Sequence, residues 1–148
     1  MNPIKTKAIQ YLARREHSEK ELQTKLEQHF TNPSQIQQVL AELREENYLS
    51  NTRFLESRIR HRLSQGYGRL KISQELTQIH GLKSEEIRAA FAGVPDTESE
   101  LDRLHQLIQK KYASLDRQNQ AEVARLTRKL LQRGFSYALI KLAFQAEC

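Results

Sequence analysis

Three pairs of apolar residues, each pair spaced for one face of a helix, recur along this chain at intervals of about 50 residues. A second apolar position follows each pair after 10 or 11 residues. A module of this length buries little apolar surface alone, so we expect three stacked copies whose neighbours share cores. The pairs are Leu22/Leu26, Ile72/Leu76 and Leu126/Leu130, and the second positions are Ile36, Ile87 and Ile140.

The remaining signals also indicate helices. The chain lacks tryptophan, and no segment alternates apolar and polar residues as a half-buried strand would. Helical spacing of apolar residues occurs throughout the sequence, which predicts an all-α fold. The expected helices cover residues 3–15, 18–29, 34–46, 51–65, 68–80, 84–92, 97–113, 118–133 and 136–146.

Capping residues support these boundaries. Ser18 to Glu21 has the pattern of a capping box, in which a hydroxyl and a carboxylate each accept a backbone amide. Ser34 to Gln37 and Thr97 to Glu100 repeat the device. Gly81 and Gly134 follow apolar helical segments, where a left-handed C-terminal cap favours glycine.

Cysteine content and hydropathy restrict the cellular compartment in which we expect this protein. Cys148 is the only cysteine, so neither an internal disulfide nor a thiolate metal cluster can form. The first residues lack the apolar segment of a signal peptide, and no stretch has the roughly 18 apolar residues that a membrane helix needs. We expect a soluble cytoplasmic protein that does not bind membranes.

The sequence contains no convincing catalytic or cofactor motif. The segment from Gly66 to Gly68 resembles a phosphate-binding loop only superficially, because no strand precedes it and no third glycine follows. We interpret it as a helix stop and a turn. We therefore expect neither an enzyme nor a metal or cofactor protein. The histidines lack metal-ligand spacing; they are His17, His29, His61, His80 and His105.

The net charge of +6 is unevenly distributed. Residues 1–50 carry 7 basic and 7 acidic side chains, and residues 96–148 carry 9 and 7. Residues 51–95 carry 8 basic and 4 acidic side chains, a net of +4. Such a local excess favours an acidic or polyanionic partner.

The helix expected over residues 51–65 concentrates this charge. Leu55, Ile59 and Leu63 form a row that can face a core, and arginines flank it on both sides. They could bind phosphates or an acidic protein groove. Alternatively, they form a solvated face whose stems cover apolar surface. Arg58 and Arg62 lie beside the row with Phe54, Arg53 and Arg60 point outward, and Tyr67 follows as a stacking surface.

Many ordered landmarks, from about residue 8 to residue 145, resemble the RecX regulatory proteins. This resemblance implies three tandem three-helix repeats in an elongated, curved molecule. We place the repeats at residues 1–49, 50–95 and 96–148. The landmarks are Tyr11 through Leu22 with Lys25-Leu26, Tyr48-Leu49, Arg53-Phe54, Gly66-Tyr67-Gly68, Ile72, Glu75-Leu76, Lys111-Tyr112, Arg133 through Tyr137 and Ile140.

The resemblance also implies a function. RecX-like proteins bind the RecA recombinase and lie within the groove of its filament on single-stranded DNA. There they block extension or promote disassembly, and so restrain ATP hydrolysis and strand exchange in recombination and repair. Some also bind DNA directly. We expect the same partners for this chain, acting as a monomer.

Two positions depart from the family pattern. Ser50-Asn51 stand where acidic residues are usual, and Arg69 replaces a proline after the glycine turn. Contacts at these positions therefore need not be those of the family. We predict that the middle repeat supplies the main binding residues. They are Arg58, Arg60, Arg62, Tyr67, Arg69 and Lys71, with Arg14, Arg15, Arg125, Arg128 and Arg133 as weaker candidates.

A sequence-specific duplex-binding protein of the helix-turn-helix type is the alternative. Its recognition helix would be Ser34–Glu46, Ser84–Ala92 or Ser136–Gln145. These helices are poor in side chains that read bases, and the first carries three glutamates that repel phosphate. A purely structural scaffold is a third option, which the uneven charge and the resemblance disfavour.

Overall fold

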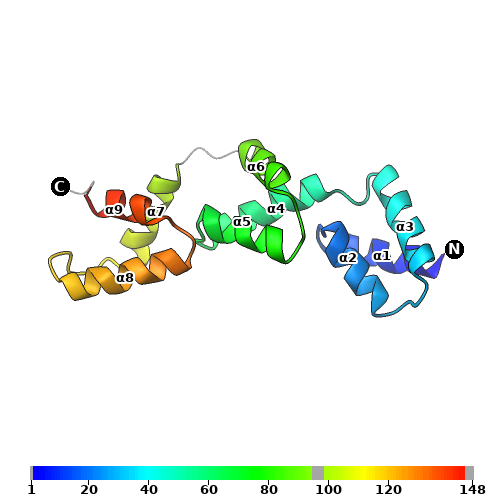
Figure 1. Cartoon of the computed structure of the whole chain (residues 1–148), viewed down its shortest axis with the longest axis horizontal. Coiled ribbons are helices and arrows are strands. Elements are labelled where there is room, and N and C mark those ends of the chain that lie inside the picture. Colours follow the sequence, from blue (N-terminus) through cyan, green and yellow to red (C-terminus); the bar gives the residue numbers. More distant parts are fainter. Residues whose placement is uncertain (1, 95–98, 146–148) are drawn as a thin grey trace. The chain divides into compact units, whose positions relative to one another are not determined.

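A computed structural model of the chain describes residues 2–94 and 99–145. Over these residues it forms nine α-helices and no strand, as predicted (Figure 1). None of these helices is both long and apolar enough to cross a bilayer. Boundaries lie within two residues of expectation, except that residue 97, the expected start of α7, and residue 146, the expected end of α9, lie outside the described residues. The helices are α1 (Pro3–Arg14), α2 (Glu19–Glu27), α3 (Pro33–Glu45), α4 (Asn51–Ser64), α5 (Arg69–Gln78), α6 (Ser84–Gly93), α7 (Glu100–Lys111), α8 (Gln120–Gln132) and α9 (Tyr137–Gln145).

Of the two hydrogen bonds of the capping box predicted at the start of α2, the one to the serine hydroxyl is confirmed. Ser18 Oγ accepts the amide of Glu21 at 3.1 Å. The carboxylate of Glu21, however, binds Arg15 at 2.5 Å instead of completing the box. Because an arginine offers a charge-assisted partner, the acidic residue joins α2 to the preceding loop.

The caps of α3 and α7 differ from the prediction. Asn32, not Ser34, caps α3 by accepting the amide of Gln35 at 3.2 Å. Pro33 then occupies the first helical turn, where its missing amide costs nothing. Ser99 caps α7 by accepting the amide of Asp102 at 3.1 Å, whereas the predicted cap Thr97 lies outside the described residues.

The predicted helix-ending glycines are confirmed. Gly81 has a φ of 64° and Gly134 a φ of 99°, both in the left-handed region that favours glycine. The amide of Gly134 donates to the carbonyl of Leu131 at 3.0 Å, and the next amide donates to Leu130 at 3.2 Å. The end of α8 is thereby closed by its own backbone.

The chain divides into two compact units. Unit 1 consists of residues 1–58 and 76–93, and unit 2 of residues 59–75 and 94–148. Helices α4 and α5 each contribute to both units, so residues predicted as the second repeat are divided between them. The predicted repeat boundaries remain a prediction.

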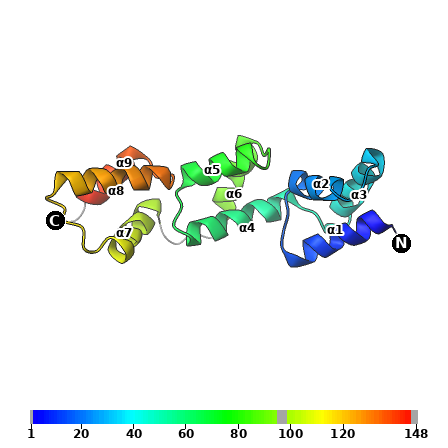
Figure 2. The same ribbon diagram turned by 90° about the horizontal axis from the view of Figure 1, so that it is seen from below.

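In unit 1, α1, α2 and α3 pack around one apolar cluster (Figures 1 and 2). The predicted pair Leu22 and Leu26 lies at its centre with Ile36, and the first two are fully buried. Tyr11 and Phe30 pack against its edge. Ile87 of α6 and Leu76 of α5, also predicted as core, are buried in the same unit.

In unit 2, α7, α8 and α9 enclose a second cluster that includes the predicted Leu126, Leu130 and Ile140. Each cluster is formed by residues of one predicted repeat: the first cluster by residues of the first repeat, and the second cluster by residues of the third. The expectation that neighbouring repeats share cores is therefore wrong for these two. Backbone hydrogen bonds from Gly68 and Leu70 to Arg133 and Gly134 join residues of different predicted repeats, and they position the candidate site.

Candidate functional site

Tyr67 of unit 2 lies among three cations. The charged groups of Arg62, Lys71 and Arg133 are 5.5, 5.2 and 5.6 Å from the centre of its ring. Each such contact contributes about 0.5–1 kcal/mol at an exposed position. The structure thus brings together four of the predicted binding residues, from α4, α5 and the turn after α8. The ring, predicted as a stacking surface, contacts these three positive charges in the structure.

The local fold follows from the glycines around Tyr67. Gly66 ends α4 with a φ of 87°, as the predicted helix stop requires. Gly68 has a second role that the sequence interpretation missed, since its amide donates to the carbonyl of Arg133 at 2.7 Å. The amide of Leu70 donates to Gly134 at 3.1 Å. The turn between α4 and α5 is therefore docked on the turn between α8 and α9.

This docking requires a residue without a side chain. A Cβ on Gly68 would lie 2.5 Å from the carbonyl carbon of Gly134 and 2.7 Å from the nitrogen of Phe135. Real Cβ contacts of this kind do not occur at such distances. The Gly-Tyr-Gly segment is thus a joint between two turns as well as the end of a helix.

Arg62 is neutralised within the chain. Its Nε and Nη2 donate to the two carboxylate oxygens of Glu75 at 3.2 and 2.6 Å. The two side chains are only 24% and 15% exposed. The hydrogen bond to Glu75 raises the pKa of Arg62, against the opposing effect of burial. A bidentate pair with this geometry holds the guanidinium against Tyr67, so Arg62 is better suited to positioning Tyr67 than to contacting a partner.

Arg133 also has a structural contact. Its Nη1 donates to the carbonyls of Gln65 and Gly66 at 3.2 and 3.3 Å. These carbonyls follow the end of α4, where the helix leaves acceptors unpaired and a cation is favoured. Arg133 therefore caps α4 with one nitrogen while its charge stays beside Tyr67.

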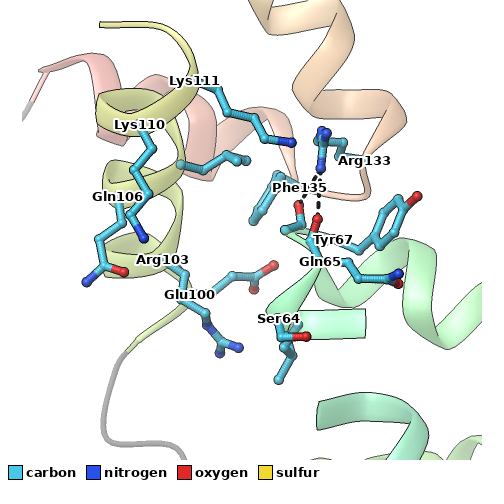
Figure 3. Close-up of a pocket in the computed structure, with 13 residues that line it drawn as sticks. Ser64, Gln65, Tyr67, Glu100, Arg103, Gln106, Lys110, Lys111, Arg133 and Phe135 are labelled. Carbon is cyan, nitrogen blue, oxygen red and sulfur yellow. Dashed lines mark hydrogen bonds between the residues drawn. The ribbon is translucent and has the colours of Figure 1, made fainter. Parts of the chain in front are cut away.

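A pocket of about 740 Å³ lies beside this joint (Figure 3). It opens between α7, the turn after α4 and the turn after α8, all in unit 2. Its cations on α7 are Arg103, Lys110 and Lys111, and Arg133 lies across from them. The three α7 cations are not among the binding residues predicted from the sequence. Their spacing placed them on one helix face, but nothing indicated that this face borders Tyr67.

The remaining predicted residues of the middle repeat lie on α4 and α5. Arg58 is half-buried and belongs to unit 1, whereas Arg60 is exposed and belongs to unit 2. Arg69 begins α5 and is exposed, and its amide donates to Glu100 Oε1 at 3.0 Å. Arg53, expected to point outward, binds Glu16 at 2.9 Å. The arginines of α4 therefore do not form one uniform cationic strip.

The weaker candidates other than Arg133 lie at the end of α1 and on α8. Arg14 is exposed at the end of α1, and Arg15 is paired with Glu21. Arg125 and Arg128 are exposed on α8. Arg125 also lines a small pocket of about 160 Å³ together with Lys111 and Lys129.

Unit 1 contains a buried polar cluster that the sequence did not reveal. His17 is 1% exposed; its Nε2 lies 2.8 Å from Lys25 Nζ, and its Nδ1 lies 3.0 Å from the carbonyl of Arg15. An ammonium can only donate, so the ring is neutral with its proton on Nδ1. Burial is the main cause that lowers the pKa of His17. Ser18 Oγ also lies 2.7 Å from Nδ1 of His80, which is buried.

Within residues 2–94 and 99–145 no group of histidine, cysteine, aspartate and glutamate side chains has the arrangement of a metal site. The buried histidines instead connect secondary structure within unit 1. The ring of His80 lies 4.6 Å from that of Phe54, so one imidazole contacts both the cap of α2 and the start of α4. Their burial could not be read from the sequence, because the contacting residues are far apart in it.

Comparison with known proteins identifies the family. Models of the first, second and third three-helix domains of RecX match residues 5–43, 50–90 and 98–144. The regulatory protein RecX of Pseudomonas putida strain GB-1 is 40% identical over 140 residues, covering 93% of this chain and 86% of that protein. The RecX of Ralstonia pickettii strain 12J is 36% identical over 137 residues, with 93% and 83% covered.

A solved structure agrees with the fold. The crystal structure of RecX from Lactobacillus salivarius superposes with a TM-score of 0.77 at 19% identity, covering 97% of this chain and 93% of that one. At this low identity, the structural similarity supports the fold alone, whereas the sequence relatives support the family assignment. All three domain models and both relatives agree, so this chain belongs to the RecX family of regulatory proteins.

Proposed function

We propose that this chain binds the RecA nucleoprotein filament through the cations that surround Tyr67 and lie near it. The general function follows from family membership over nearly the whole chain. The protein is a regulator that modulates RecA, and it is not an enzyme. The filament contact, and the inhibition of filament extension, ATP hydrolysis and strand exchange, follow as the mode of action. The proposed compartment is the cytoplasm, where RecA acts on chromosomal DNA.

The arrangement around Tyr67 supports this surface. Lys71 and Arg69 are exposed at the start of α5, and Arg60 is exposed on α4. Arg62 and Arg133 hold the ring that lies between these elements. Several cations on one unit attract a polyanion and raise its rate of association, and the effect weakens within a Debye length of about 8 Å at physiological salt.

The predicted residues then have two kinds of role. Arg60, Arg69 and Lys71 of unit 2 contact the filament, and Arg58 of unit 1 is proposed as a separate contact. Arg62, Tyr67 and Arg133 position the surface. Arg14, Arg15, Arg125 and Arg128 contribute long-range attraction. The repeats at residues 1–49, 50–95 and 96–148 form the proposed domains of a monomer.

The test measures RecA's ATP hydrolysis on single-stranded DNA. Wild-type protein should inhibit hydrolysis at substoichiometric amounts. The variant R60E/R69E should need more protein for the same inhibition, since it reverses two exposed charges on the proposed surface. Unchanged ATP turnover and strand exchange at equimolar protein would contradict the function itself.

The matched control is R88E/K141E, which reverses two exposed charges outside the proposed surface. Neither residue has a hydrogen bond or ion pair with any residue in the described part of the chain. The control should inhibit RecA as wild type does. If both double variants lose inhibition equally, net charge and not this surface determines binding.

A further inference from the structure

Lys25 of α2 and His17 form a hydrogen-bonded pair that the proposed function does not use. Lys25 Nζ lies 2.8 Å from Nε2 of His17, and both residues belong to unit 1. His17 is 1% exposed, whereas Lys25 is half-buried, so a reagent in solution can reach the lysine while the imidazole stays covered. The pair therefore consists of a partly accessible primary amine and a shielded base.

The carbonyl of Arg15 fixes the role of the imidazole. His17 Nδ1 lies 3.0 Å from this oxygen, which can only accept, so the neutral ring carries its proton on Nδ1. Nε2 is then an acceptor whether Lys25 is an ammonium or a neutral amine. In the neutral amine one N–H donates to Nε2, and the tetrahedral nitrogen directs its lone pair away from the ring. A nucleophile bonded to a base that a third group orients is the arrangement of activated nucleophiles in proteins.

The surroundings of Lys25 favour its neutral form. Burial is the main cause that lowers the pKa of Lys25, and the charge of Arg15 is the next. Arg14 acts in the same direction, whereas Glu21 opposes it. The carboxylate of Glu21 is itself paired with Arg15 at 2.5 Å. Lys25 is therefore a free amine more often than an ordinary lysine is at neutral pH.

Lys7 of α1 provides an internal comparison. The charged groups of Lys7 and Lys25 lie 5.4 and 5.0 Å from the centre of the Tyr11 ring, and both residues are half-buried. The side chain of Lys7 has no hydrogen bond or ion pair with any residue in the described part of the chain. Contact with the ring thus needs no imidazole, and the adjacent base distinguishes Lys25 from Lys7.

We propose that Lys25 is a site of acylation by thioesters, with His17 as the general base. Thioesters suit this amine, because they persist in water and react with neutral amines. The Nζ lone pair attacks the thioester carbonyl carbon, and a C–N bond forms. Nε2 of His17 takes the proton that the nitrogen loses. The C–S bond then breaks, and the departing thiolate takes up a proton as the imidazolium releases one. The products are an amide and a free thiol.

The product fits the same surroundings. Its amide keeps one N–H that can donate to Nε2 of His17, so the buried acceptor retains a donor. The reaction also removes a positive charge that Arg14 and Arg15 repel. This inference is independent of the proposed function and is tested without RecA, so failure of one leaves the other standing.

The experiment incubates the full chain with acetyl-coenzyme A at a pH of about 8, where an ordinary lysine is almost fully protonated. Digestion and mass spectrometry measure the acetylation of each lysine over time. Lys25 should react about 100-fold faster than Lys7, which is the lower end of what a positioned base contributes. A rate at Lys25 no higher than that at Lys7 would overturn the proposal.

A neutral thioester, S-acetyl-N-acetylcysteamine, separates the effect of the base from attraction of the coenzyme. The preference for Lys25 should persist with this donor, since the base acts on the amine. A preference that occurs with acetyl-coenzyme A alone would mean that nearby cations attract the phosphates of the coenzyme. That result would overturn the role of His17.

H17Q tests the base itself, because glutamine can accept a hydrogen bond from Lys25 but does not take up its proton. The rate at Lys25 should fall to that at Lys7, while the rate at Lys7 stays unchanged. The matched control is H29Q, since His29 is exposed in the same unit, and it should keep the preference. Circular dichroism verifies that both variants fold. An unchanged rate at Lys25 in folded H17Q would overturn the proposal.

Two measurements on the wild-type chain do not depend on the folding of H17Q. In urea that unfolds the chain, Lys25 and Lys7 should react equally, since only the folded state pairs Lys25 with the imidazole. In the native chain, the rate at Lys25 should level off below a pH of about 10.4, the pKa of an ordinary lysine, because the pKa of Lys25 is lowered. A preference that survives unfolding, or a rate that still rises at that pH, would overturn the proposal.

Discussion

Replacing Gly68 by alanine tests the joint between the two turns of unit 2. The added Cβ would lie 2.5 Å from the carbonyl carbon of Gly134, a backbone atom that cannot rotate away. Gly68 is not among the residues with positive φ, so the contact and not backbone strain causes the loss.

The expected loss follows from two contributions. Forcing an extra methyl group into a packed position costs about 1–3 kcal/mol. The shift also weakens the hydrogen bonds of the Gly68 and Leu70 amides, each of which contributes about 1 kcal/mol. We therefore expect G68A to lower the free energy of unfolding by about 2–4 kcal/mol.

Urea denaturation followed by circular dichroism measures the global effect, and amide hydrogen exchange at residues 68 and 70 measures opening of the joint itself. G93A is the control, because a Cβ on Gly93 meets only the end of the Glu56 side chain, at 3.2 Å. It should change stability by less than about 1 kcal/mol. If G68A matches G93A in stability and leaves both amides protected, the joint has no energetic role.

Two further predictions concern stability. E75Q leaves Arg62 with a neutral partner in a half-buried position, so it should cost about 1–3 kcal/mol in urea unfolding; a double-mutant cycle with R62Q should show coupling, and additive effects would refute the pairing. The pKa of His17 is lowered below its ordinary value of 6.5, so the unfolded chain binds more protons as pH falls below 6.5. Stability should accordingly be full above that pH and decline below it. H17Q should flatten this dependence relative to the exposed-site control H29Q, and an unchanged profile would contradict the neutral, buried imidazole.

Helix positions and core residues could be predicted because they depend on short-range pattern. Leu22, Leu126 and Ile140 are buried as expected, since a spacing of three or four residues alone determines one helix face. The cap of α3 was misplaced by two residues because Asn32 and Ser34 are both good caps, and the choice depends on Pro33.

The long-range contacts could not be predicted in the same way. Gly68 and Gly134 meet through backbone atoms, which leave no signature in side-chain pattern. The pocket depends on which helix faces Tyr67, and periodicity does not specify neighbours. From the sequence, Arg62 appeared available for a partner protein or nucleic acid. The carboxylate that pairs with it belongs to Glu75, which is 13 residues away on the next helix.

The backbone character of the joint has a consequence for how such repeats can diverge or be exchanged. Main-chain donors and acceptors are common to all residues, so the outward faces of α5 and α8 can change sequence freely while the turns stay docked. At the joint, the steric requirement falls on the two glycines. A chimaera that imports only a foreign turn between α4 and α5 should therefore still dock on the turn between α8 and α9, provided that the incoming turn keeps a glycine at the position of Gly68.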